Sequence, residues 1–264
     1  MTTVTAAPPA RPLRPATEET VFVGRSLRHS LRNVEAMLMA VLLPVFLMLL
    51  FVYVFGGAID PSGDYVDYVV PGIILLCAGF GASSTAVDVA DDASSGLMDR
   101  FRTLPIRSWA VVTGHVVASL ARNLVATAVV IAVALAIGFR PTAGPGEWLL
   151  AVGVVALYIL TITYLFAAIG LATGSPEAAN GYGFVLLFLP YVSTAFVGAQ
   201  TLPRWLRGVA EHQPITPVIE TLRGLLMGTD SGSAPLLAAA WLTGILLVAV
   251  VWSARQFRRR AGRR

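Results

Sequence analysis

Lysine is absent from this sequence, and cysteine and charged residues are scarce. All 19 basic residues are arginine, which excludes the phosphate-binding loop GxxxxGK(S/T), because that loop needs a lysine to reach the phosphates. The single cysteine, Cys77, lies in an apolar run and excludes both an internal disulfide and a cysteine-based metal site. Charged residues make up 13% of the 264 positions, far below the roughly 25% of soluble domains.

Long apolar runs fill the sequence instead. Hydrophobic residues make up 56% of the chain, and its mean hydropathy is +0.74. A helix needs about 20 mostly apolar residues to cross a bilayer, and six uncharged runs meet or approach that length. We therefore predict an all-α, polytopic membrane protein with six transmembrane helices, at about residues 36–57, 68–88, 113–138, 147–173, 179–200 and 233–254.

The membrane domain is expected to cover residues 21–258, between two polar ends. Residues 1–20 are rich in proline and alanine without periodicity, which predicts a disordered cytoplasmic tail, and they contain no signal-peptide pattern. Residues 255–264 form a basic tail of six arginines directly after the last span. Such a cluster is better explained as an orientation anchor than as a nucleic-acid patch, so no nucleic acid is expected as a partner.

The distribution of arginine predicts the orientation. With six spans and the N-terminus inside, fourteen arginines fall on the cytoplasmic side, and four fall outside, at Arg140, Arg204, Arg207 and Arg223. Because positive residues stay on the cytoplasmic side, both termini are expected in the cytoplasm. The lack of lysine is typical of a GC-rich bacterial genome, so we expect a bacterial plasma membrane.

A charged island separates the second and third apolar runs, from Asp88 to Arg107. Ser94 or Ser95 can cap a helix there and Pro105 can end it, which predicts a short amphipathic helix. Its charges and exposed apolar residues together indicate a docking surface on the cytoplasmic side. The alternative is a solvated loop. The candidate docking residues are Leu97, Met98, Asp99, Arg100, Phe101, Arg102, Leu104 and Pro105.

A second amphipathic stretch precedes the first span. Its leucines and arginines fall on opposite helix faces, which predicts a helix lying on the membrane surface and contacting lipids. The alternative is an extended start of the first span. The residues concerned are Arg25, Leu27, Arg28, Leu31 and Arg32.

The segment 200–233 follows the fifth run and is expected outside the cell. It contains two helices too short to cross a membrane, so we predict either a hairpin that dips into the outer leaflet or a flat cap. Its candidate residues are Trp205, Gln213, Pro214, Glu220 and Arg223.

Three polar residues interrupt the start of the third span. His115, Ser119 and Arg122 follow one another at spacings of four and three, so they share one helix face. An ionisable residue at membrane depth is a functional candidate by default. The alternative is that Arg122 extends to the cytoplasmic headgroups.

Three segments together resemble the permease subunits of type-2 ABC exporters, in particular the daunorubicin/doxorubicin-resistance branch. They are GLMDRFRTLP at 96–105, IGFRP at 137–141, and LPRWL, QPITP and RGLL between 202 and 226. The resemblance covers Val21 to Arg258. Gln213 departs from it, since many relatives have asparagine before the proline.

The resemblance implies a transporter subunit that binds no cofactor itself. A separate ABC ATPase subunit would use ATP and Mg and would dock at a coupling helix, residues 95–105. The chain would form a homodimer or a dimer with a paralogous permease, and would export a hydrophobic drug, lipid or glycolipid. In that family the external hairpin re-enters the membrane.

Other functions are less well supported by the residues. A stand-alone secondary transporter or channel is the main alternative, but ion-coupled carriers usually hold carboxylates within their spans, and here these lie at ends or in loops. A membrane enzyme or metal site is disfavoured because His29, His115 and His212 lie in three separate regions. A structural subunit without its own conduit is a further alternative.

Overall fold

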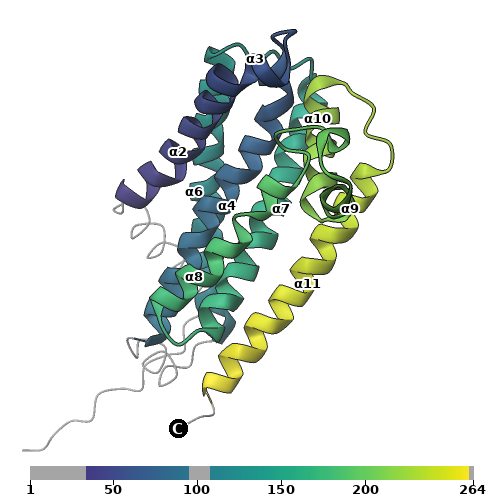
Figure 1. Ribbon diagram of the computed structural model, residues 1–264. Helices are drawn as coiled ribbons and strands as arrows, with labels where there is room; N and C mark the ends of the chain where they lie inside the picture. The colour runs from purple at the N-terminus through teal and green to yellow at the C-terminus, as the bar shows by residue number, and fades with distance from the viewer. Residues whose placement is uncertain (1–33, 95–107, 262–264) are drawn as a thin grey trace, which may run out of the picture.

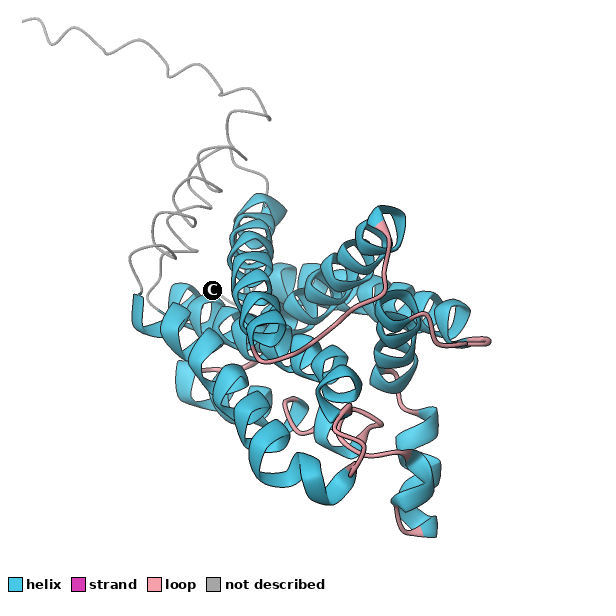
Figure 2. Cartoon of the chain, turned by 90° about the horizontal axis from the view of Figure 1, so that it is seen from above, coloured by secondary structure: helices cyan, strands magenta, loops and turns pink. Residues whose placement is uncertain are grey.

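The computed structural model describes residues 34–94 and 108–261, and in these ranges the chain forms helices and no strand (Figures 1 and 2). The all-α prediction is confirmed for this part of the chain. The elements are α2 (Val34–Leu49), the π-helix η1 (Leu50–Phe55), α3 (Gly56–Ile59), α4 (Tyr65–Ser94), α6 (Ser108–Ala136), α7 (Pro145–Ala172), α8 (Pro176–Leu186), the 3-10 helices η2 (Leu189–Val192) and η3 (Ala199–Thr201), α9 (Arg204–His212), α10 (Ile215–Met227) and α11 (Ala234–Ala261).

Within residues 34–94 and 108–261, five helical stretches are long and apolar enough to cross a membrane. They overlap the first four expected spans and the last one, because an apolar run of about 20 residues can satisfy all of its backbone hydrogen bonds in hydrocarbon by forming a helix. Their bounds are Ala40–Ile59, Tyr65–Ser94, Thr113–Ala136, Pro145–Ala172 and Ala234–Phe257.

The expected fifth span, 179–200, is not one continuous helix. α8 ends at Leu186, and the chain continues through η2 and a series of turns. Pro190 lies in η2 and has no amide hydrogen, so it cannot bond to the carbonyl of Leu186 as a continuing α-helix would require. Because residues 179–200 are mostly apolar, hydropathy alone did not predict this break.

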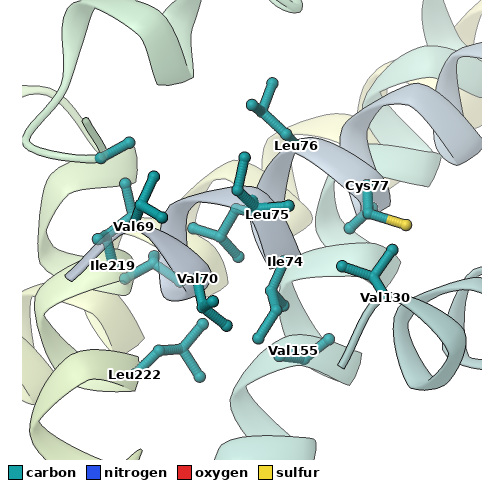
Figure 3. Close-up of a cluster of buried hydrophobic side chains, with 14 of the residues drawn as sticks. Val69, Val70, Ile74, Leu75, Leu76, Cys77, Val130, Val155, Ile219 and Leu222 are labelled. Atoms are coloured by element: carbon teal, nitrogen blue, oxygen red, sulfur yellow. The ribbon is translucent and has the colours of Figure 1, made fainter. Parts of the chain in front are cut away.

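Helix α4 lies at the centre of the bundle and contacts α2, α6, α7, α8 and α10. A helix that is apolar on every side is typically buried on every side. Figure 3 shows this arrangement: side chains of α4 point toward Val130 of α6, Val155 of α7, and Ile219 and Leu222 of α10. Any displacement of α4 therefore affects most of the bundle.

The bundle has two distinct ends (Figure 1). At the loop end, α4 ends at Ser94 and α6 begins at Ser108; at the opposite end, which we call the hairpin end, lies α3, and α10 and α9 follow below it in the view. Helix α4 continues six residues beyond the expected span. Asp88, Asp91 and Asp92, the first acids of the charged island, consequently lie in its last turns.

Two small residues permit close helix contacts. A side chain at Gly170 of α7 would collide with the carbonyl oxygen of Ala86 in α4, and one at Gly81 would collide with the Asn123 side chain of α6. Small residues let helix backbones approach closely in membranes. A packing role therefore fits Gly170 and Gly81, while Gly174 faces open space.

Candidate functional site

Polar residues of α6 face the second half of α4 near the loop end. The imidazole Nε2 of His115 lies 2.9 Å from a carboxylate oxygen of Asp92. One level further into the bundle, Arg122 donates to the Ser84 hydroxyl at 2.7 Å and to the carbonyl of Gly81 at 3.3 Å. The Arg122 guanidinium thus lies against α4 and bonds to it within the bundle.

A further set of hydrogen bonds, centred on Ser119, reaches a third helix. The hydroxyl of Thr85 donates to the Ser119 oxygen at 3.0 Å, and the Asn123 amide donates to it at 3.1 Å. Thr163 of α7 lies 3.5 Å from Ser119. We call this network of side chains from α4, α6 and α7 the loop-end cluster; it consists of Ser84, Thr85, Asp92, His115, Ser119, Arg122, Asn123 and Thr163.

The loop-end cluster joins helices by contacts between side chains. Asp88 also lies close enough to Arg122 for their charges to interact. Hydrogen bonds within a dry bundle hold helices in one register. The arrangement can therefore make α4 and α6 move together. The sequence pattern found three members; Asn123 was detectable, since it follows Ser119 by four residues, whereas the α4 and α7 partners depend on tertiary packing.

A second polar cluster lies at the hairpin end around Arg223 of α10. Arg223 donates to the carbonyls of Tyr68 and Thr194, both at 3.1 Å, and its guanidinium lies 3.8 Å from the centre of the Tyr68 ring. Tyr68 donates its own hydroxyl to the same Thr194 carbonyl at 2.9 Å. Nearby, Tyr65 donates to the carbonyl of Phe196 at 2.8 Å.

Gln213 completes this cluster at the turn between α9 and α10. Its amide nitrogen donates to the carbonyls of Leu189 and Val192, at 3.1 and 3.0 Å. Broken helices persist at membrane depth only where other groups satisfy their free carbonyls. The hairpin-end cluster, defined as Tyr65, Tyr68, Gln213 and Arg223, supplies such donors to residues 189–196. Sequence reasoning missed Tyr65 and Tyr68.

The other predicted residues have simpler surroundings. Trp205 on α9 is 77% exposed, Pro214 precedes the first residue of α10, and Glu220 is half-buried. The predicted interfacial residues 25–32 and the predicted docking residues 97–105 lie outside the described residues. In the part of the chain that the structure describes, no group of three His, Cys, Asp or Glu side chains could hold a metal ion.

The chain is similar to one family of known proteins, both by its family profile and by comparison with individual proteins. The profile of the ABC-2 type transporter family matches residues 18–227. A daunorubicin resistance ABC transporter permease protein of Streptomyces coeruleorubidus is 29% identical over 209 residues, covering 78% of this chain and 71% of the relative. A probable doxorubicin resistance ABC transporter permease protein of Mycobacterium tuberculosis is 27% identical over 240 residues, covering 89% and 86%.

Proposed function

This chain belongs to the ABC-2 type transporter family, and we propose that it is the permease subunit of an exporter for a hydrophobic drug, lipid or glycolipid. The family match over residues 18–227 carries this proposal. The relatives named above are permease proteins of ABC transporters, and in this proposal ATP hydrolysis belongs to a separate subunit. Planar amphiphilic drugs of the daunorubicin type are the cargo to test first, since both relatives are named for resistance to them.

The ATPase subunit docks at residues 95–105 in this proposal. The described helices on both sides support it, because α4 ends at Ser94 and α6 begins at Ser108. A force on the intervening segment acts on both helices, and the loop-end cluster holds them together beside that segment through Asp92 and His115. ATP-driven movement would then pass through α4, which contacts most of the bundle.

Six membrane crossings are proposed, with the broken segment 176–196 making the fifth. This segment follows α4 along its length: Ala179 clusters with Ala86, Leu187 approaches Gly79, and Ala195 lies against Gly72. These contacts run from Ala86 to Gly72, about 21 Å along α4 at 1.5 Å per residue, and the hydrogen bond from Tyr65 to Phe196 extends them by about 10 Å. The combined length equals the roughly 30 Å hydrocarbon core, which supports a complete crossing.

The α9–α10 hairpin is proposed to dip into the membrane from the outer side. Gln213 at its turn bonds to Leu189 and Val192, which lie between the levels of Gly79 and Gly72 of α4. The opposite end of α10 is near the α6–α7 loop, where the Thr142 amide donates to the carbonyl of Leu226. These contacts support a turn well below the hairpin end. Both chain termini are proposed to be cytoplasmic on a separate ground, because fourteen arginines fall on that side when the chain crosses six times. The lack of lysine favours a bacterial plasma membrane as the location.

A second permease, identical or paralogous, is proposed to pack against the aromatic face formed by η1, α8 and η2. Phe51 stacks on Phe196 at 4.2 Å, and Phe196 stacks on Tyr191 at 5.4 Å. The series continues to Phe188 and Phe184, which are 51% and 57% exposed. Aromatic rings of this kind are enriched in the cores of protein interfaces, which supports this face for a dimer.

The decisive experiment reverses two charges of the docking segment. Arg100→Glu with Arg102→Glu is expected to leave membrane insertion intact and to abolish co-purification of the ATPase subunit. ATP-dependent doxorubicin uptake into inside-out vesicles should disappear with it. Arg11→Glu with Arg14→Glu, the same charge change in the N-terminal tail, is the control. Uptake driven by an ion gradient without the ATPase subunit contradicts the proposal and favours a stand-alone secondary transporter.

A further inference from the structure

An apolar crevice lies between α6 and α7 and is closed on its inner side by α4 and α10. Its volume is about 270 Å³, and no polar atom is exposed on its wall. Three of its side chains, Ile74, Val155 and Leu222, appear in Figure 3, each from a different helix. The full lining is Ile74, Leu124, Thr127, Ala128, Ile131, Trp148, Ala151, Val152, Val155, Leu222 and Leu226.

We propose that this crevice binds a hydrocarbon chain of a membrane phospholipid. Its size and its lining both restrict the occupant. Water takes up about 30 Å³ per molecule and does not fill apolar cavities, so the space is not a water site. Left empty, it would deprive eleven side chains of dispersion contacts that a packed interior provides. A flexible apolar chain restores those contacts without leaving a polar group unpaired.

The opening of the crevice selects lipid over other apolar molecules. Ala128 and Val152 are lining residues that are also exposed, and both lie within candidate membrane spans. Ala128 lies eight residues before the end of α6 at Ala136, and Val152 lies seven residues after the start of α7 at Pro145. These separations correspond to depths of about 10–12 Å. Phospholipid chains of the nearer leaflet are the most abundant apolar groups at that depth.

A chain in this place would secure the hairpin. Leu222 and Leu226 of α10 form one wall, so the occupant touches α10 on one side and α6 and α7 on the other. Trp148 lies at the third residue after Pro145 at the start of α7, where tryptophan typically marks the membrane interface. The bound chain therefore joins the hairpin to two spans, and its removal should loosen this contact. This inference is independent of the cargo and of the ATPase partner.

Tryptophan fluorescence tests the proposal directly. A variant that keeps only Trp148 is titrated in detergent with phosphatidylcholine whose second chain is brominated, because bromine quenches tryptophan on contact. A variant that keeps only Trp241, which is 43% exposed on α11, is the control. Trp148 should be quenched at low ratios of lipid to protein, before Trp241. Quenching of the two in parallel overturns the proposal.

Filling the crevice gives a second readout. Ala128→Phe should abolish the early quenching of Trp148 and raise the melting temperature in detergent by about 3 °C. Added phospholipid should raise the melting temperature of the unmodified chain but not that of the Ala128→Phe variant. Val129→Phe is the matched control, since Val129 is the exposed neighbour on α6 that does not line the crevice. If Ala128→Phe does not fold, Val152→Phe replaces it. Early quenching that survives in the filled variant also overturns the proposal.

Discussion

The two polar clusters differ in the groups that their side chains bond to. In the loop-end cluster, most contacts join one side chain to another across unbroken helices, as between Arg122 and Ser84. In the hairpin-end cluster, the hydrogen bonds described above run from side chains to main-chain carbonyls of a broken or neighbouring segment, as from Gln213 to Leu189. Both clusters contain a half-buried arginine, yet their surroundings predict different roles.

This difference predicts different consequences of mutation. A carbonyl that loses its donor at membrane depth has no water to replace it, so damage to the hairpin-end cluster should lower stability and transport together. A side-chain pair can lose one member while the backbone of both helices stays bonded. Damage to the loop-end cluster should therefore reduce transport more than stability. Four substitutions test this contrast.

Arg223→Leu should have the largest effect. It removes two hydrogen bonds to carbonyls and a cation–π contact with Tyr68, and we expect a loss of about 3 kcal/mol in the free energy of unfolding. Thermal melting in detergent measures it. Arg207→Leu on the same hairpin is the control, because the exposed Arg207–Glu211 pair contributes less than about 1 kcal/mol. If Arg223→Leu and Arg207→Leu lower the free energy of unfolding equally, the hairpin-end cluster does not have the stabilising role that distinguishes it from the loop-end cluster.

Gln213→Leu should come next. It leaves the carbonyls of Leu189 and Val192 without their amide donor at nearly constant side-chain size, at a cost of about 2 kcal/mol. Gln213→Asn keeps the amide on a shorter side chain and should recover part of the stability. Melting temperature and membrane yield are the readouts. A Leu variant as stable as the Asn variant would show that these two bonds do not support the broken segment.

Ser84→Ala should affect transport more than stability. It removes the 2.7 Å bond from Arg122, with an expected stability loss of about 1 kcal/mol. ATP-dependent doxorubicin uptake should fall severalfold while the ATPase subunit still co-purifies. Ser83→Ala is the matched control, since Ser83 bonds only to the carbonyl of Phe80 in its own helix among the contacts described. Similar uptake by both variants argues against a role for the α4–α6 contact.

Asp92→Asn should have the smallest effect on stability, about 0.5 kcal/mol, because the partly exposed His115–Asp92 pair keeps a hydrogen bond when the charge is lost. The informative quantity is the ratio of cargo moved to ATP hydrolysed, which should fall. Asp91→Asn, at the exposed neighbouring position, should leave that ratio unchanged. If the ratio of cargo moved to ATP hydrolysed is unchanged in both variants, the His115–Asp92 pair does not contribute to coupling. Any role of the loop-end cluster in transport would then rest on the contacts around Arg122.

Local patterns in the sequence predicted part of each cluster. The spacing of His115, Ser119 and Arg122 identified one polar face of α6, because helical periodicity depends only on nearby residues. It could not identify Ser84 or Asp92 as partners, since these depend on the register between α4 and α6. The break at 187–198 was missed for a related reason: hydropathy records composition, and a proline in a span is compatible with a simple kink.

The amino-acid sequence by itself determined that this protein is helical, resides in a membrane and belongs to the ABC-2 type transporter family, since hydropathy, helical spacing and family motifs are carried by neighbouring residues. Only the tertiary structure decided which groups satisfy the broken segment and which side chains join α4 to α6. Arg223 and Tyr68 lie 155 residues apart in the chain, and a hydrogen bond over that separation exists only once helix packing has brought its donor and acceptor within about 3 Å.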